Sequence, residues 1–165
     1  MKRLLSLFLV MLLLLCGCNN GTASTENTFT FYYLEHEYQY GQAASMIAPE
    51  HRESTSQRKD LMYMMNLYMM GPAEEAHIMP LPAETRINCH EMEDGSIKLE
   101  LSGAARLLSD SEFSLACTCL SLTCFNITES PEVTVVNGNR SITINRNNYL
   151  LKDDITSYSA TEETK

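Results

Sequence analysis

The chain lacks an apolar run of the length that a transmembrane helix requires. Its amino-terminal apolar run, residues 4–15, would extend about 18 Å as a helix, whereas the hydrocarbon core of a bilayer is roughly 30 Å thick. Positive charge is also scarce: 12 Lys and Arg residues stand against 21 Asp and Glu residues, a formal net charge of −9. An excess of negative charge repels phosphate backbones. The composition therefore argues against a retained membrane span and against nucleic-acid binding.

Motifs of common catalytic sites are missing as well. The sequence has no Gly-x-Ser-x-Gly nucleophile turn, no His-Glu-x-x-His zinc motif and no glycine loop that would cradle a phosphate. Acidic residues do neighbour two histidines, since His36 lies between Glu35 and Glu37, and His90 precedes Glu91. Such neighbours arise easily in an acidic chain, and strand alternation would point Glu35 and Glu37 away from His36. We therefore expect solvated clusters and a protein that is not an enzyme.

The amino-terminal residues have the pattern of a lipoprotein signal peptide. Two basic residues are followed by the apolar run and then by small Gly17, which directly precedes a cysteine. Cleavage after Gly17 would make Cys18 the first mature residue, with its thiol free to take a diacylglyceryl group. Two buried acyl chains hold a protein firmly on a bilayer. The pattern predicts a signal peptide over residues 1–17 and a lipid anchor at Cys18, on the extracytoplasmic face of the cell membrane.

Polar segments flank one folded domain. Residues 18–27 are rich in Asn, Gly, Thr and Ser and have little to bury, which is typical of a flexible tether, and residues 150–165 have the same character. We expect the domain itself over residues 28–149. Removal of the signal peptide takes away two basic residues and no acidic one, so 12 − 2 = 10 basic side chains remain against 21 acidic ones.

Four cysteines remain besides Cys18. Cys117 and Cys124 would lie about 10 Å apart on one helix, too far for a disulfide. A disulfide between Cys89 and a helix thiol stays open, although cysteine is also a common small core residue. Cys117 and Cys119 are closer in sequence than the usual pair of zinc ligands. The spacing therefore favours helix thiols that pack in the core.

Alternating and aromatic patterns predict six strands. The strands are expected at residues 29–33, 45–48, 86–92, 97–101, 133–136 and 141–145. Asp94-Gly95 and Asn137-Gly138 are turn sequences that join the last four strands into two hairpins.

Apolar residues at helical spacing predict two helices. The first starts near residues 54–56, which offer caps, and ends at Gly71; the second is capped by Asp110 or Ser111 and ends near Asn126. Their core faces are expected to be Leu61, Met64, Met65 and Tyr68, and Phe113, Ala116, Cys117, Leu120 and Cys124. The elements do not alternate as in a parallel sheet. We expect an α+β fold, a mainly antiparallel sheet with two helices packed on one face.

Methionines crowd the first helix. Thioethers are soft ligands that select Cu(I), so Met62, Met64, Met65 and Met69 are candidate copper ligands. Methionine is also an adaptable core filler, and this interpretation is favoured. Met62, Met69 and Met70 lie off the core face, where they would form a contact surface for a partner.

Eight short segments serve as landmarks along the chain: Phe31-Tyr32-Tyr33, Ile47 to Arg52, Leu67 to Pro72, Leu81 to Thr85, Asp94-Gly95, Leu99 to Ser102, Leu122-Thr123 and Val133 to Gly138. Their order and spacing resemble those of the GerM-type (GerMN) domain of spore-forming Gram-positive bacteria. The resemblance covers residues 28–149. It implies a single small domain, similar to ring-building modules, carried by membrane lipoproteins that act in sporulation and germination. GerM proteins often carry two such modules, whereas this chain carries one, and no catalytic residue is transferred.

These observations predict a membrane-tethered, non-catalytic interaction protein without a cofactor. Its expected partners are the membrane, through the diacylglyceryl anchor, and other envelope proteins or a second copy of the chain. The alternative is an envelope lipoprotein that binds a small ligand or Cu(I) through the methionine-rich helix.

Overall fold

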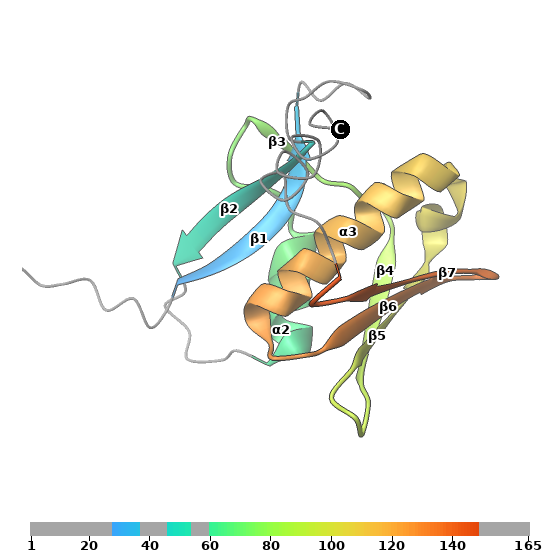
Figure 1. Cartoon of the computed structure of the whole chain (residues 1–165). Coiled ribbons are helices and arrows are strands. Elements are labelled where there is room, and N and C mark those ends of the chain that lie inside the picture. The colour runs from blue at the N-terminus through green and yellow to red at the C-terminus, as the bar shows by residue number, and fades with distance from the viewer. Residues whose placement is uncertain (1–27, 37–45, 54–59, 149–165) are drawn as a thin grey trace, which may run out of the picture.

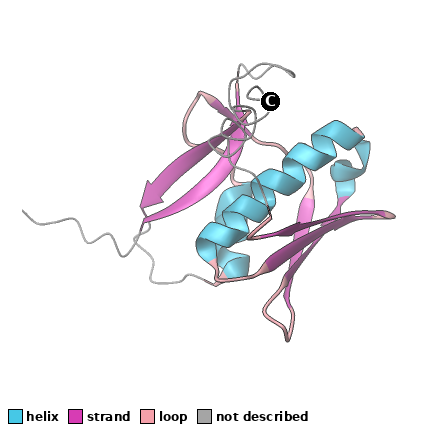
Figure 2. Ribbon diagram, viewed as in Figure 1, coloured by secondary structure: helices cyan, strands magenta, loops and turns pink. Residues whose placement is uncertain are grey.

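The computed structural model describes residues 28–36, 46–53 and 60–148 (Figure 1). In these segments seven strands form a three-stranded sheet of order β2-β1-β3 and a four-stranded sheet of order β4-β5-β6-β7. Helix α3 lies between the two sheets (Figure 2). The predicted α+β class is confirmed and antiparallel pairs predominate, although the strands divide between two sheets where one was expected. No helix in the described segments has the length and apolarity to span a bilayer.

The three-stranded sheet contains β1 (Thr28–Glu35), β2 (Ile47–Glu53) and β3 (His77–Ile78), all antiparallel. The prediction that the second strand stops before Pro49 was wrong, because β2 continues through this proline. Pro49 lies opposite Tyr32 on an outer strand, and it is exposed. A proline is tolerated on an outer strand where its missing N–H would face away from the sheet.

The four-stranded sheet contains the two predicted hairpins, which are both confirmed. They are β4 (Arg86–Glu91) with β5 (Ile97–Ser102), and β6 (Glu132–Asn137) with β7 (Arg140–Asn145). The hairpins meet through β5 and β6, which are parallel. A parallel pair needs a long crossover connection, and α3 supplies it.

Among the described residues, three helical segments connect these strands: α2 (Leu61–Met69), the 3₁₀ helix η2 (Gly103–Leu107) and α3 (Asp110–Ile127). Both helices were predicted, but their caps were not. The Asp60 side chain caps α2 by accepting from the Tyr63 N–H at 3.0 Å, and the candidate caps at residues 54–56 lie outside the described residues.

The cap of α3 is Ser109, so the prediction of Asp110 or Ser111 was wrong by one or two positions. Ser109 and Glu112 form a reciprocal capping box, in which the Glu112 carboxylate accepts from the Ser109 N–H at 2.8 Å and the Glu112 N–H donates to Ser109 Oγ at 3.3 Å. This pairing satisfies two backbone donors at once, which a cap at position 110 would not do with the same glutamate.

Helix α3 lies along β1 and binds its backbone. Thr30 N–H donates to Asn126 Oδ1 at 2.7 Å, and Tyr32 N–H donates to Thr123 Oγ1 at 3.0 Å. Further along the same edge of β1, Leu34 and Glu35 pair with β3. Side chains of α3 and a short strand therefore share one edge of β1.

The predicted core faces are confirmed. All nine helix residues named above are buried, as are the inward residues Ile97, Leu99 and Leu101 of β5. Because α3 is packed between two sheets, it is buried on more sides than an amphipathic surface helix, and Ser121 and Thr123 are buried with its apolar residues.

Candidate functional site

A buried carboxylate joins β2 to the segment that follows α2. Glu50 is 1% exposed, and its two oxygens accept hydrogen bonds from the Ala73 N–H, the Glu74 N–H and the Arg52 guanidinium. The Nδ1 atom of His77 lies 3.1 Å from Glu50 Oε2. Since Glu50 and Arg52 are two residues apart on a strand, both side chains project from the same face.

Aromatic rings extend this cluster into the core. Arg52 donates to the Gly71 carbonyl at 2.7 Å, and its guanidinium lies 5.0 Å from the centre of the Phe31 ring. The rings of Tyr33 and Tyr68 are stacked, with centres 4.8 Å apart, and the Tyr33 hydroxyl donates to the Tyr68 carbonyl. We call Glu50, Arg52, Tyr33, Tyr68 and His77 the Glu50 cluster; it connects β1, β2, α2 and β3.

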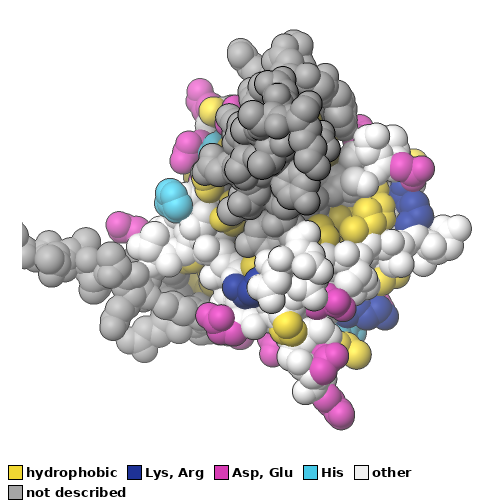
Figure 3. Space-filling view, viewed as in Figure 1, with side chains coloured by type: hydrophobic (Ala, Val, Ile, Leu, Met, Phe, Trp, Pro, Cys, Tyr) yellow, Lys and Arg dark blue, Asp and Glu magenta, His cyan; other side chains and the backbone are white. Residues whose placement is uncertain are grey.

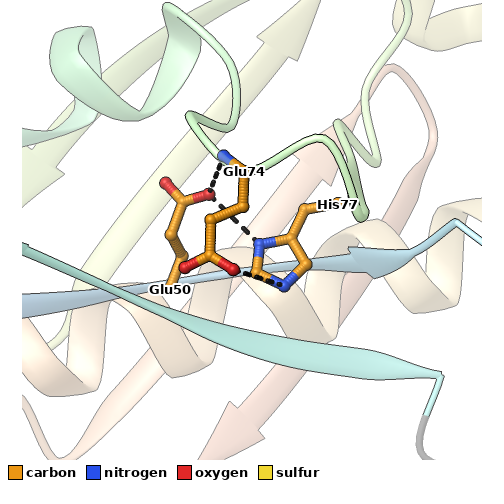
Figure 4. A group of neighbouring side chains, drawn as sticks. All are labelled: Glu50, Glu74 and His77. Atoms are coloured by element: carbon orange, nitrogen blue, oxygen red, sulfur yellow. Dashed lines mark hydrogen bonds and ion pairs between the residues drawn. The ribbon is translucent and has the colours of Figure 1, made fainter.

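Glu50, Glu74 and His77 are the one group of acidic and histidine side chains in the described residues that meets closely enough to hold an ion (Figure 4). However, hydrogen-bond donors already surround both Glu50 oxygens. An ion there would have to displace some of these donors, which include a guanidinium. The donor set therefore fits a structural carboxylate better than a metal ligand.

The hydrogen bonds also determine the protonation of Glu50. Burial alone would raise the pKa of this carboxyl, but the N–H groups of Glu74 and Ala73, together with His77 and Arg52, outweigh burial and lower the pKa below its ordinary value. Glu50 is therefore an ionised carboxylate at neutral pH and not a general acid.

The lowered pKa of Glu50 predicts acid sensitivity. Its carboxylate contributes stability above its unfolded pKa, and this contribution is lost as the pH falls through the lower folded pKa. We expect urea midpoints measured from pH 7 down to pH 3 to fall more steeply for the wild type than for Glu50→Gln. Parallel curves for the two proteins would contradict this prediction.

A second feature is a hollow of about 330 Å³ between α2 and β4. Its lining combines apolar and polar side chains. They are Met65, Asn66, Met69, Thr85, Arg86, Ile87 and Asn88. The hydroxyl of Thr85 is buried and has no hydrogen-bond partner among the described residues.

The structure separates the candidate copper ligands. Met64 and Met65 are buried in the core, whereas Met62 is 43% exposed. By their spacing Met62, Met65 and Met69 share one helix face, while Met64 projects from another. Met65 and Met69 line the hollow, so at most part of the predicted set of ligands faces a common space.

The contact surface predicted from the sequence is partly exposed. Met70 is 81% exposed, Met62 is open to solvent, and Met69 is half-buried against the core. We call Met62, Met69 and Met70 the α2 surface. It lies next to the hollow, because Met69 belongs to both.

The four described cysteines are free thiols. Burial raises the pKa of Cys89 to about 11 and that of Cys117 to about 12, and it raises the pKa of Cys119 and Cys124 as well. A protonated, buried thiol is a poor nucleophile and a poor metal ligand. The prediction that the helix thiols belong to the core is confirmed.

Other predicted sites are scattered or lie outside the described residues. Cys18 and Glu37 belong to the segments that the structure leaves undescribed. His36 and His90 are exposed, as expected. The Glu50 cluster had no assigned role in the sequence, although four of its five members, all but His77, belong to the GerMN landmarks, as does Gly71. The available signal was a glutamate and an arginine two residues apart, which share a face once the strand continues past Pro49.

No family model matches the sequence, and no curated protein sequence matches it. The fold is similar to the first GerMN domain of the sporulation protein GerM from Bacillus subtilis, with a TM-score of 0.51 and 10% identity over 70% of this chain and 85% of that one. Similarity to the tandem GerMN domains of that protein gives a TM-score of 0.50 and 11% identity. That match covers 70% of this chain and 40% of the tandem, so this chain spans less than half of the tandem. A candidate lipoprotein from Clostridium perfringens shows a TM-score of 0.43 and 14% identity, over 73% of this chain and 87% of that one.

The order of the elements, the two sheets around α3 and the two likenesses to GerMN domains agree on one fold. The described part of this chain is a GerMN-like α+β domain.

Proposed function

We propose that this protein is a lipoprotein anchored to the outer face of the cell membrane, whose GerMN-like domain binds other envelope proteins without catalysing a reaction. The complex it joins would act in sporulation, in germination or more generally in the cell envelope. Support comes from the fold, which is similar to a domain of a sporulation protein, and from the lipoprotein pattern that ends at Cys18.

The observation that carries the interaction role is the exposed α2 surface. Met70 is 81% exposed, so its apolar side chain faces solvent beside half-buried Met69. Contiguous apolar area that is left exposed often marks a protein contact site. On the face drawn in Figure 3, by contrast, acidic side chains are scattered around the rim rather than gathered in one patch.

The chemistry of the described titratable groups supports a non-catalytic role. The most buried carboxylate, Glu50, is ionised and surrounded by donors, and burial keeps the described thiols protonated. A catalytic site instead needs a poised acid, base or nucleophile that faces a substrate.

Lipid attachment can be tested by metabolic labelling with an alkyne fatty acid. We expect the full chain to take up label and to fractionate with membranes. Cys18→Ser should abolish the label, whereas the matched variant Cys16→Ser should keep it, because residue 16 belongs to the predicted signal peptide. Label that survives in Cys18→Ser would contradict the anchor.

Partner contact can be tested by photocrosslinking in cells. A photoreactive amino acid at position 70 should give an adduct of defined mass with another protein. Position 107 is the matched control, because Leu107 in η2 is 83% exposed and comparable to Met70. The interaction role would be contradicted if positions 62, 69 and 70 gave no adduct, or none beyond that at position 107.

A further inference from the structure

The outer edge of β4 is not paired with any strand in the part of the chain that the structure describes, because β4 ends the four-stranded sheet. Met92 N–H donates to the Ser96 carbonyl at 2.9 Å. Along an antiparallel strand, residues that bond to the partner strand alternate with residues whose backbone groups point away from it. Because Met92 bonds to the residue that precedes β5, the backbone N–H and C=O groups of Ile87, Cys89 and Glu91 point away from β5. A row of outward N–H and C=O groups is a template on which another strand can pair.

The hollow between α2 and β4 opens beside this edge. Met65, Met69 and Ile87 supply its apolar lining, and Ile87 also contributes to the outward backbone groups. A strand that paired with β4 would therefore place side chains of one face next to the apolar lining of the hollow. At about 3.3 Å per residue, six paired residues would cover about 20 Å of the edge.

The two faces of β4 differ in chemistry. Ile87 and Cys89 are half-buried and pack against the core, whereas Arg86, Asn88 and His90 are exposed and alternate with them. Among the described residues, no carboxylate forms an ion pair with Arg86, although the chain is strongly acidic. The exposed face of β4 thus presents an unpaired positive charge to whatever strand lies beside it.

We propose that β4 binds an extended segment of a partner protein in which apolar residues alternate with acidic ones. The apolar side chains would lie toward α2 and the hollow, and a carboxylate on the other face would lie beside Arg86. The backbone would pair with the outward groups of Ile87, Cys89 and Glu91. This inference rests on the proposed interaction function and specifies the chemistry of the partner.

The probe is an acetylated and amidated hexapeptide of alternating valine and glutamate, titrated into the full chain in detergent. We expect saturable binding that shifts the backbone amide signals of Ile87, Cys89 and Glu91. Arg86→Glu should weaken binding by about tenfold or more, since it replaces attraction by repulsion. Arg106→Glu is the matched control, because Arg106 is also exposed but lies in η2, and it should bind like the wild type.

A second pair of variants tests the backbone contacts. Glu91→Pro removes an outward N–H from an exposed position of an end strand, where proline is tolerated. It should weaken binding, whereas Thr143→Pro in β7, at the opposite end of the sheet, should not. Peptide binding that shifts β7 and leaves the β4 amides unchanged would overturn the proposal, as would no binding.

The outcome is separable from the proposed function. If crosslinking at position 70 still gives its adduct while the peptide fails to shift the β4 amides, the strand site is overturned and the interaction role stands. If the peptide binds β4 and Arg86→Glu abolishes the crosslink at position 70, both the strand site and the interaction role are supported. A peptide of alternating valine and lysine that binds equally well would overturn the role of Arg86 and with it the acidic partner.

Discussion

Glu50→Ala should lower the free energy of unfolding by about 3 kcal/mol or more, since removing one partner of a buried ion pair leaves the other uncompensated. In this variant the Arg52 guanidinium would lose its carboxylate, and the Ala73 and Glu74 N–H groups would lose their acceptor. Because the Glu50 cluster connects four elements, the loss should spread beyond β2. Urea unfolding followed by circular dichroism measures the effect.

Glu100→Ala is the matched control for this experiment. Glu100 also pairs with a basic residue, Lys98 at 2.6 Å, but its side chain is 42% exposed. Solvent screens exposed ion pairs and leaves them with little net stabilisation, so this variant should unfold near the wild-type midpoint. Equal losses in the two variants would show that the burial of Glu50 has no special role.

Gly103→Ala should lower the free energy of unfolding by about 2–4 kcal/mol. Gly103 has a φ of +72°, and a Cβ atom there would lie 2.5 Å from the backbone carbonyl oxygen of Glu84. Glu84 itself has a φ of 66°, so its backbone is already in a sparsely populated conformation. The variant would push apart the turn before β4 and the start of η2. Thermal unfolding measures the loss.

Gly138→Ala separates the two causes of this effect. Gly138 has a φ of +64°, close to that of Gly103, but no atom lies within 4 Å of an added Cβ. This control should cost only about 1–2 kcal/mol, the price of the left-handed backbone alone. If both variants lost the same stability, the contact between Gly103 and Glu84 would be irrelevant.

Local sequence signals were sufficient for most of the elements. The Asp94-Gly95 and Asn137-Gly138 sequences predict both hairpins, because short loops fix the register of the strands beside them. Apolar spacing likewise identified the buried faces of α2 and α3. These predictions succeed because each depends on neighbours within a few residues.

Contacts between distant segments could not be predicted in the same way. No local pattern states that Ile97 will pair with Val133 in parallel, or that Thr123 on α3 will bind the backbone of β1. The Glu50 cluster illustrates the same limit, since Tyr33, Glu50 and His77 meet only after three strands and a helix have assembled. The hollow beside β4 also depends on where α2 packs relative to β4.

The hydrogen bonds from β1 to α3 have a consequence for the solubility of the domain. Thr123 and Asn126 occupy the N–H groups of Tyr32 and Thr30, which would otherwise offer pairing sites to a neighbouring molecule. Strand edges that remain open promote uncontrolled polymerisation into fibrils or amorphous aggregates. Two polar side chains of α3 thus keep the most aromatic strand from serving as such a template along this edge.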